Sequence, residues 1–140
     1  MLAATYLIET DTETVAYFCL SNDNLKREVK DRLTADEKTI WNRLSRIIPH
    51  PKRRGTYPAV KIGRLAVAKK YAGSGMGRKI LNIVTQIYLE QNQRSGCRFI
   101  TVDAYANAFG FYQKNGFDFI TDKDNGDKTR ALFFDLKRMQ

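Results

Sequence analysis

The sequence predicts a mixed α/β domain, and two observations support this prediction. Strand-like and helix-like segments follow one another along all 140 residues, and no linker divides them, so residues 1–140 are expected to form a single domain. The central segment is an apolar run over residues 59–67, followed by a glycine-rich turn and by an amphipathic helix that ends near Gln91. This strand, turn and helix organise the rest of the chain.

The first third of the chain predicts a hairpin and a helix. Two β-type runs, residues 2–8 and 15–20, flank the polar stretch 10–14, and the turn formers at 21–24 are expected to end the second strand. Residues 26–33 show little apolar face and are left unassigned. Thr34 and Glu37 form a capping box for a helix that Pro49 ends. The apolar residues along this helix are Ile40, Trp41, Leu44 and Ile47.

The segments after the glycine helix predict three strands and one short helix. Residues 97–104, 117–120 and 131–136 are strand-like, and residues 106–114 predict a helix that an Asn-Gly pair stops. The Asp-rich polar loop 122–128 could be interpreted as a calcium-binding loop. An EF-hand needs glycine at its sixth position and glutamate at its twelfth, but counting from Asp122 these positions hold Asp127 and Phe133. The loop is therefore interpreted as a plain hairpin connection.

The glycine turn is the strongest functional signal. Gly73, Gly75 and Gly77 leave backbone N–H groups unshielded before a helix, and Arg78 adds a cation, which predicts an anion-binding turn. A flexible turn without a ligand is the alternative. A P-loop needs Lys-Ser or Lys-Thr after its last glycine, and here Arg78 and Lys79 follow. A dinucleotide-binding turn would need a glycine at position 78.

Composition limits the classes of partner. Lys and Arg number 24 and Asp and Glu 15, giving a net charge of +9, which suits CoA, nucleic acid or membrane headgroups. One histidine, His50, argues against a metal site. Cys19 and Cys97 lie in apolar runs and are interpreted as buried free thiols in a reducing compartment. No membrane-length apolar run and no leader sequence is seen, so a cytoplasmic protein without a membrane partner is expected.

Two motifs resemble those of the GNAT superfamily of acyl-CoA N-acyltransferases. Residues 72–77 (AGSGMG) resemble motif A, Q/R-x-x-G-x-G/A, with Ala72 in place of Gln or Arg, and residues 108–117 (AFGFYQKNGF) resemble motif B, A-x-x-x-Y-x-K-x-G-F. Residues 57–67 and 101–104 are similar to the fourth and fifth strands of the family. The resemblance implies a GNAT-like fold, with a mixed, mostly antiparallel sheet, flanking helices, and splayed parallel fourth and fifth strands.

The resemblance also implies an activity, namely direct transfer of the acetyl group of acetyl-CoA to a primary amine, without a metal. Tyr112 matches the motif B tyrosine and would act as general acid to the CoA thiolate, whereas packing among neighbouring aromatic residues is its structural alternative. Tyr105 stands where the family has an asparagine, and Asn107 lies nearby. The implied cofactor-binding residues are Leu65, Ala66, Val67, Ala72, Gly73, Ser74, Gly75, Met76, Gly77, Arg78 and Asn107.

Two parts of the implied site have no clear counterpart. The family begins with a strand and two helices that cover the acceptor side, whereas this sequence opens at the hairpin. The acceptor side is therefore expected to be open, or completed by a second copy in a homodimer. No glutamate lies on the fourth strand, so Asp103, and more weakly Asp23, are the candidates for a general base. An amine that is already neutral would need none.

The function of the chain has three interpretations, of which two differ in the acceptor of the acetyl group. The first acceptor is an unspecified amine. The second is the amino group of aminoacyl-tRNA, because residues 58–67 resemble those of GNAT toxins of toxin–antitoxin pairs, and because the chain is basic, with a Lys52-Arg53-Arg54 run. The third, from a different class, is a non-enzymatic nucleic-acid-binding module that uses this run together with Arg43 and Arg46. The sequence shows no reading helix or aromatic platform for that role.

Overall fold

A six-stranded mixed sheet forms the framework of the computed structural model, which describes residues 2–26, 42 and 55–140. The strand order is β1-β2-β3-β4-β6-β5, and only β3 and β4 pair in parallel, which confirms the predicted mixed α/β class. The strands are β1 (Ala4–Glu9), β2 (Thr14–Lys26), β3 (Thr56–Val67), β4 (Phe99–Tyr105), β5 (Asp118–Phe119) and β6 (Thr129–Asp135). The helices are α2 (Met76–Gln91) and α3 (Phe109–Lys114), with 3-10 turns η3 (Lys69–Tyr71), η4 (Ala106–Ala108) and η5 (Leu136–Met139). The predicted helix before Pro49 and the basic run 52–54 lie outside the described residues.

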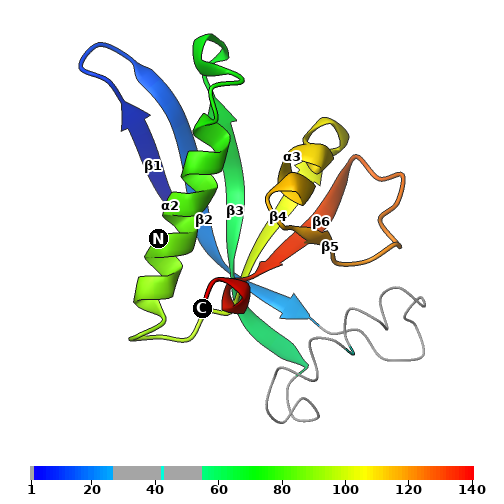
Figure 1. The fold of residues 1–140 in the computed structure, drawn as a ribbon. Helices are drawn as coiled ribbons and strands as arrows, with labels where there is room; N and C mark the ends of the chain where they lie inside the picture. The colour runs from blue at the N-terminus through cyan, green and yellow to red at the C-terminus, as the bar shows by residue number, and fades with distance from the viewer. Residues whose placement is uncertain (1, 27–41, 43–54) are drawn as a thin grey trace.

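The sheet opens into a V between β3 and β4, with β1–β3 in one arm and β4–β6 in the other (Figure 1). Parallel pairing joins residues 59–62 to residues 99–102 and goes no further. The register of β2 against β3 shifts at this point, since Leu20 pairs with Ile62 and Cys19 with Arg64, leaving Gly63 between them. A bulge bends its strand and increases the local twist. Beyond Ile62, β3 therefore diverges from β4, which confirms the predicted splay of these two strands.

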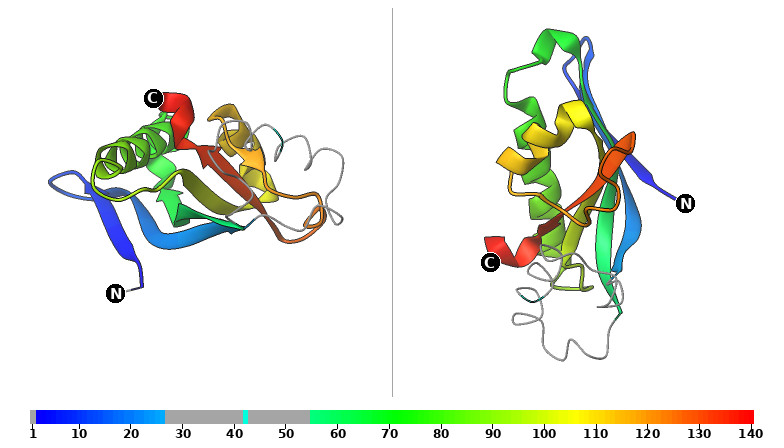
Figure 2. Two further views of the ribbon diagram at one scale, coloured as in Figure 1. Left: turned by 90° about the horizontal axis from the view of Figure 1, so that it is seen from below. Right: turned by 90° about the vertical axis from the view of Figure 1, so that its right-hand side faces the viewer.

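The described helices cover one face of the sheet, α2 over the arm of β1–β3 and α3 over the arm of β4–β6 (Figures 1 and 2). The apolar face predicted for α2 is buried at Ile80, Leu81 and Val84, whereas Ile87 and Tyr88 are half-buried. The main core lies between these helices and the sheet. Of the helices in the described part of the chain, none has the length and apolar character needed to cross a membrane.

A second, smaller core lies on the opposite face, and it corrects one prediction. β2 does not end at residues 21–24 but continues to Lys26, which pairs with Thr56. Leu25, only 2% exposed, packs there in a cluster with Tyr57 and Phe99. Because β3 pairs with β2 along this whole stretch and Leu25 is buried, tertiary contacts outweigh the local turn preference.

Smaller differences follow from burial and pairing. Cys19 and Cys97 are free, as predicted, but half-buried rather than buried. Burial raises the pKa of the Cys97 thiol to about 11, which keeps it protonated at neutral pH. The strand predicted over 117–120 is reduced to β5, because only Asp118 and Phe119 pair with β6, and Phe117 packs in the main core. Residues 122–128 form the predicted connection to β6.

Candidate active site

The glycine turn before α2 has the backbone geometry of an anion-binding loop. Gly73 and Gly75 have φ angles of +74° and +81°, in the left-handed region that favours glycine, and Gly75 is the N-cap of α2. A Cβ atom on either would meet nothing within 4 Å. Backbone hydrogen bonds stop at the amide of Ser74 and resume at the amide of Lys79. The N–H groups between them lie at the positive end of the helix dipole, where an anion is favoured.

Gly77 lies inside the helix rather than before it, which corrects the predicted start of α2. The helix begins at Met76, so Gly77 occupies its first turn. A Cβ atom there would lie 2.9 Å from the ring Cζ of Phe111 on α3. Glycine at this position therefore lets the two arms of the V approach each other closely beside the turn.

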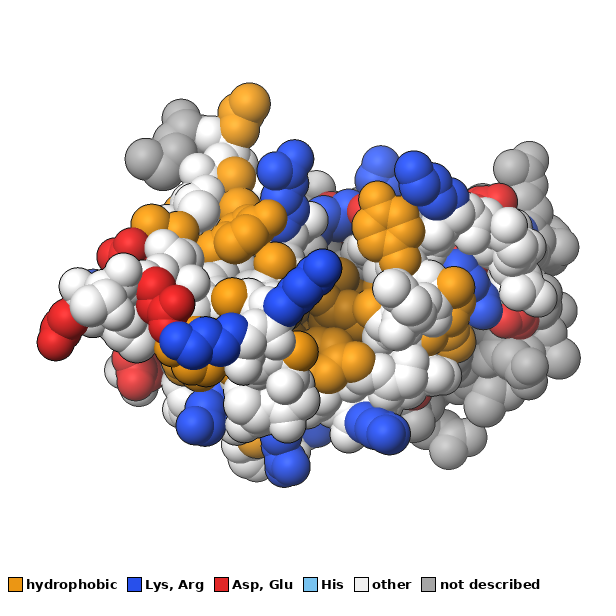
Figure 3. All heavy atoms as spheres, turned by 90° about the horizontal axis from the view of Figure 1, so that it is seen from above, with side chains coloured by type: hydrophobic (Ala, Val, Ile, Leu, Met, Phe, Trp, Pro, Cys, Tyr) orange, Lys and Arg blue, Asp and Glu red, His pale blue; other side chains and the backbone are white. Residues whose placement is uncertain are grey.

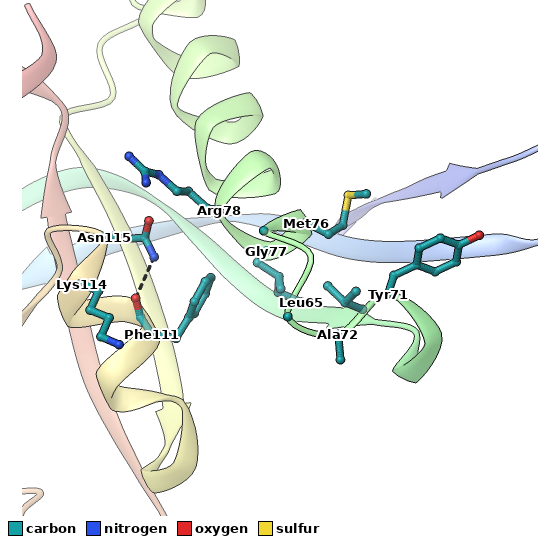
Figure 4. Close-up of a pocket in the computed structure, with 12 residues that line it drawn as sticks. Leu65, Tyr71, Ala72, Met76, Gly77, Arg78, Phe111, Lys114 and Asn115 are labelled. Carbon is teal, nitrogen blue, oxygen red and sulfur yellow. Dashed lines mark hydrogen bonds between the residues drawn. The ribbon is translucent and has the colours of Figure 1, made fainter.

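A pocket of about 500 Å³ lies between the two arms. Seen from above, it is an apolar hollow with Lys and Arg side chains around its rim (Figure 3). The glycine turn and Arg78 form one wall, and residues of α3 face them across the gap (Figure 4). The lining residues are Leu65, Val67, Tyr71, Ala72, Gly73, Gly75, Met76, Gly77, Arg78, Phe111, Lys114 and Asn115. This size and apolar lining suit a small organic molecule that carries a few charged groups.

The structure brings most of the predicted cofactor-binding residues to this pocket. Eight of them line it: Leu65, Val67, Ala72, Gly73, Gly75, Met76, Gly77 and Arg78. Three do not. Ala66 alternates with Leu65 and Val67 along β3 and so faces the opposite side of the sheet. The Ser74 hydroxyl donates to the Tyr71 carbonyl, 2.5 Å away, and Asn107 is exposed on η4.

The sequence did not predict the far wall of the pocket. It consists of Phe111, Lys114 and Asn115, which all belong to the motif B segment. Their i, i+3 and i+4 spacing places them on one face of α3, a signal that could have identified them. Asn115 is fixed by the hydrogen bond from its amide to the Phe111 carbonyl, 2.8 Å long. Lys114 adds a second cation opposite Arg78.

Tyr112 lies on the core side of α3 rather than on the pocket face. It is 6% exposed and packs against Phe111 and Phe117, with ring centroids 5.0 and 5.3 Å away. It is not one of the residues that line the pocket. Burial raises the pKa of its phenol to about 12. The hydroxyl therefore stays protonated, and able to donate a hydrogen bond, at any physiological pH.

A brace from the β1–β2 hairpin holds the segment before the glycine turn. The Glu13 carboxylate accepts hydrogen bonds from the Tyr71 hydroxyl at 2.6 Å and from Lys70 Nζ at 2.8 Å. The hydrogen bond from Lys70 has the larger effect on Glu13, and together with the bond from Tyr71 it lowers the pKa of the Glu13 carboxyl. The hydrogen bond to Glu13 in turn raises the pKa of the Tyr71 phenol. The Tyr71 ring lies against the pocket while its hydroxyl points away from it (Figure 4). The brace thus fixes one wall of the pocket.

The two candidate general bases lie on the face of the sheet opposite the helices. Asp103 forms an ion pair with Lys61, with 2.8 Å between Oδ2 and Nζ. Asp23 accepts a 2.5 Å hydrogen bond from the Thr101 hydroxyl and lies 4.0 Å from the same lysine. The hydrogen bond to Asp103 raises the pKa of Lys61. Both carboxylates therefore already have partners within the protein.

The mixed sheet with splayed β3 and β4 is the fold of a GNAT-type domain. The acetyltransferase (GNAT) domain family matches residues 9–137, so this chain belongs to that family. No curated protein matches the chain. In the described part of the chain, no group of three or more His, Cys, Asp or Glu side chains could hold a metal ion.

Solved structures with a similar fold include toxins. AtaT complexed with acetyl-methionyl-tRNAfMet gives a TM-score of 0.74 at 22% identity, covering 99% of this chain and 74% of that one. AtaTR bound with AcCoA gives a TM-score of 0.71 at 20% identity, covering 99% of this chain and 73% of that one. A bacterial toxin gives 0.68 at 17% identity, covering 91% of this chain. This chain spans 63% of that toxin's length.

Proposed function

We propose that this chain transfers the acetyl group of acetyl-CoA directly to a primary amine. The observation that supports this most is the pocket between the splayed strands, which opens onto the glycine turn at the N-terminus of α2. The pyrophosphate of CoA would accept hydrogen bonds from the backbone N–H groups of residues 75–78, beside Arg78. Lys114 on the opposite wall supplies a further cation for the phosphate groups.

The upper part of β3 suits the pantetheine arm of CoA. Residues 65–67 pair with β2 on one side and with no residue of β4 on the other. Their backbone groups on the open side are therefore available to an extended ligand, which would add to the edge like a short strand. The side chains of Leu65 and Val67 give this part of the pocket its apolar surface.

The chemistry requires a neutral amine and a stabilised leaving group. The amine attacks the thioester carbonyl carbon, the C–S bond breaks, and the proton lost by the amine balances the one that the CoA thiolate gains. We assign Tyr112 to the thiolate side, where its hydroxyl would stabilise the leaving sulfur by donating a hydrogen bond. With its pKa raised to about 12, well above the reference of about 8.5 for a thiol, it donates a hydrogen bond more readily than a full proton.

For the acceptor, the observations favour the amino group of aminoacyl-tRNA over other amines. The chain carries a net charge of +9, and both candidate bases already have partners, which favours an acceptor amine that is largely neutral without a base. The amine of an aminoacyl ester has a pKa near or below the roughly 7.7–8.0 of a chain α-amine, and it meets this need. Similarity in fold to AtaT is consistent with the same assignment.

A radioactive transfer assay tests the proposal. Purified protein is incubated with labelled acetyl-CoA and, separately, with charged tRNA, a peptide α-amine and a polyamine. We expect label in acid-precipitable charged tRNA and none in uncharged tRNA. Label on another amine alone would support the acetyltransferase activity but overturn the assignment of aminoacyl-tRNA as the acceptor. Absence of transfer to every amine, in protein that retains no CoA, would favour the non-enzymatic alternative.

The brace at Tyr71 gives a smaller prediction. Tyr71→Phe, which removes the hydrogen bond to Glu13, and Glu13→Gln, which replaces the charged acceptor by a neutral amide, should each raise the KM for acetyl-CoA about 3-fold and leave kcat unchanged, because each weakens the brace that positions the pocket wall. Since the pKa of Glu13 is lowered, the brace is present at neutral pH and is lost only as the pH falls through that pKa. Glu9→Gln, on the same hairpin, is the matched control. A KM that is unchanged in both variants would contradict the role of the brace.

A further inference from the structure

β4 ends in an aromatic side chain that faces away from the helices. Along this strand Val102 and Ala104 are buried in the main core, so Asp103 and Tyr105 project from the opposite face. Tyr105 is 55% exposed, and Lys128 Nζ lies 5.8 Å from its ring centroid. Tyr105 lies beyond the last residue of β4 that pairs with β3. The ring is therefore placed at the open end of the V.

A second cation lies on the same face, on the other arm of the V. Arg64 pairs with Cys19 and alternates with Leu65, which lines the pocket on the helix side, so the Arg64 side chain projects from the outer face. It is exposed. Among the described residues, neither Arg64 nor Lys128 forms an ion pair with a carboxylate. The gap between the splayed strands is thus flanked by one exposed ring and two cations.

We propose that Tyr105, Lys128 and Arg64 form a docking surface for the single-stranded end of an RNA. A base would stack on the Tyr105 ring, and backbone phosphates would lie near the two cations. The inference rests on the proposed function, because the same RNA end would carry the acceptor amine into the gap. It adds to that function the residues that recognise the nucleic acid.

Physical chemistry favours an RNA end over other partners for this surface. Single strands are held by aromatic rings that stack on bases and by cations that follow the backbone, with no need for a large apolar area. Around Tyr105 the outer face is charged, with Lys61 and Asp103 on the neighbouring positions, so the ring is isolated rather than part of an apolar patch. An A-form duplex would not offer an unstacked base to it.

Binding of a labelled single-stranded RNA tests this surface. The probe is an octanucleotide that ends in CCA, and the readout is fluorescence anisotropy. Tyr105→Ala should weaken binding by about 5- to 100-fold, the cost of losing one stacked base, and Tyr105→Phe should restore it. Lys128→Gln and Arg64→Gln should each lower the slope of log affinity against log salt by about 0.7. Arg94→Gln, an exposed cation beyond the far end of α2, is the control and should leave the slope unchanged.

Acetyl-CoA affinity separates this inference from the proposed function. None of the three residues lines the pocket, so each variant should bind acetyl-CoA as the wild type does, which also shows that it is folded. Equal RNA affinity in the wild type and Tyr105→Ala, or no measurable binding by the wild type, would overturn the docking surface. Intact RNA binding without acetyl transfer to any amine would overturn the proposed function instead.

Discussion

Replacing Gly75 with valine is expected to weaken acetyl-CoA binding at least about 100-fold. Gly75 has φ +81°, and a Cβ atom there would project into open space beside the N-terminus of α2. A β-branched residue resists this conformation, and its bulk would cover the backbone donors that we assign to the pyrophosphate. Hydrogen bonds to charged groups contribute about 1.5–3 kcal/mol each, so the loss of two accounts for the expected effect.

Gly126→Val is the matched control for this change. Gly126 has φ +92° and likewise has nothing within 4 Å of an added Cβ atom, but it lies in the loop between β5 and β6, away from the pocket. Both variants carry the same kind of backbone strain. Titration calorimetry should show lost affinity in the first and wild-type affinity in the second, with similar decreases in Tm. Wild-type affinity in Gly75→Val would refute the assignment of the turn.

Tyr112→Phe should lower kcat by about 10²- to 10⁴-fold while KM for acetyl-CoA stays near the wild-type value. The substitution keeps the ring contacts with Phe111 and Phe117 and removes only the hydroxyl. Tyr88→Phe, a change at a half-buried tyrosine of α2 that does not line the pocket, is the control and should leave kcat unchanged. Steady-state kinetics on the acceptor that the transfer assay identifies would measure both. Near-normal turnover would assign Tyr112 to the core alone.

The raised pKa of Tyr112 also predicts how pH affects the protein. We expect kcat/KM to rise with pH as the acceptor amine becomes neutral. Because the phenol stays protonated up to about pH 12, its ionisation should not lower kcat/KM below pH 11. An unfolded tyrosine ionises near pH 10, so the folded state should lose stability between about pH 10 and 12. That part of the loss should be absent in Tyr112→Phe, as a comparison of alkaline unfolding curves would show.

The sequence predicted those parts of the fold that depend on local pattern. The hairpin, the central strand, α2 and the last strand follow from periodicity and from turn residues, and the glycine turn was predicted except that Gly77 lies inside α2. The end of β2 was wrong, because Ser21 to Asn24 favour a turn locally while the pairing of β2 with β3 and the burial of Leu25 hold an extended strand. Such pairing joins residues that lie far apart in the sequence, so local preferences do not reveal it.

The site was predictable on one side and not on the other. The residue types of Gly73, Gly75 and Arg78 predict an anion-binding turn. The spacing of Phe111, Lys114 and Asn115 groups them on one side of α3, but which side meets the gap follows from how the helix packs on the sheet. The same packing turns Tyr112 toward the core and gives its hydroxyl a raised pKa. Tyr105, too, was recognisable as an exposed ring only once the alternation of β4 was known.

Hydrogen–deuterium exchange with and without acetyl-CoA tests most directly whether the ligand occupies the pocket between the arms. We predict slower exchange of the backbone amides at residues 73–78 and 109–115, which form the two facing walls, and unchanged exchange in the loop 121–128. Binding of acetyl-CoA that leaves the amides of the glycine turn unprotected would contradict the assignment of the site.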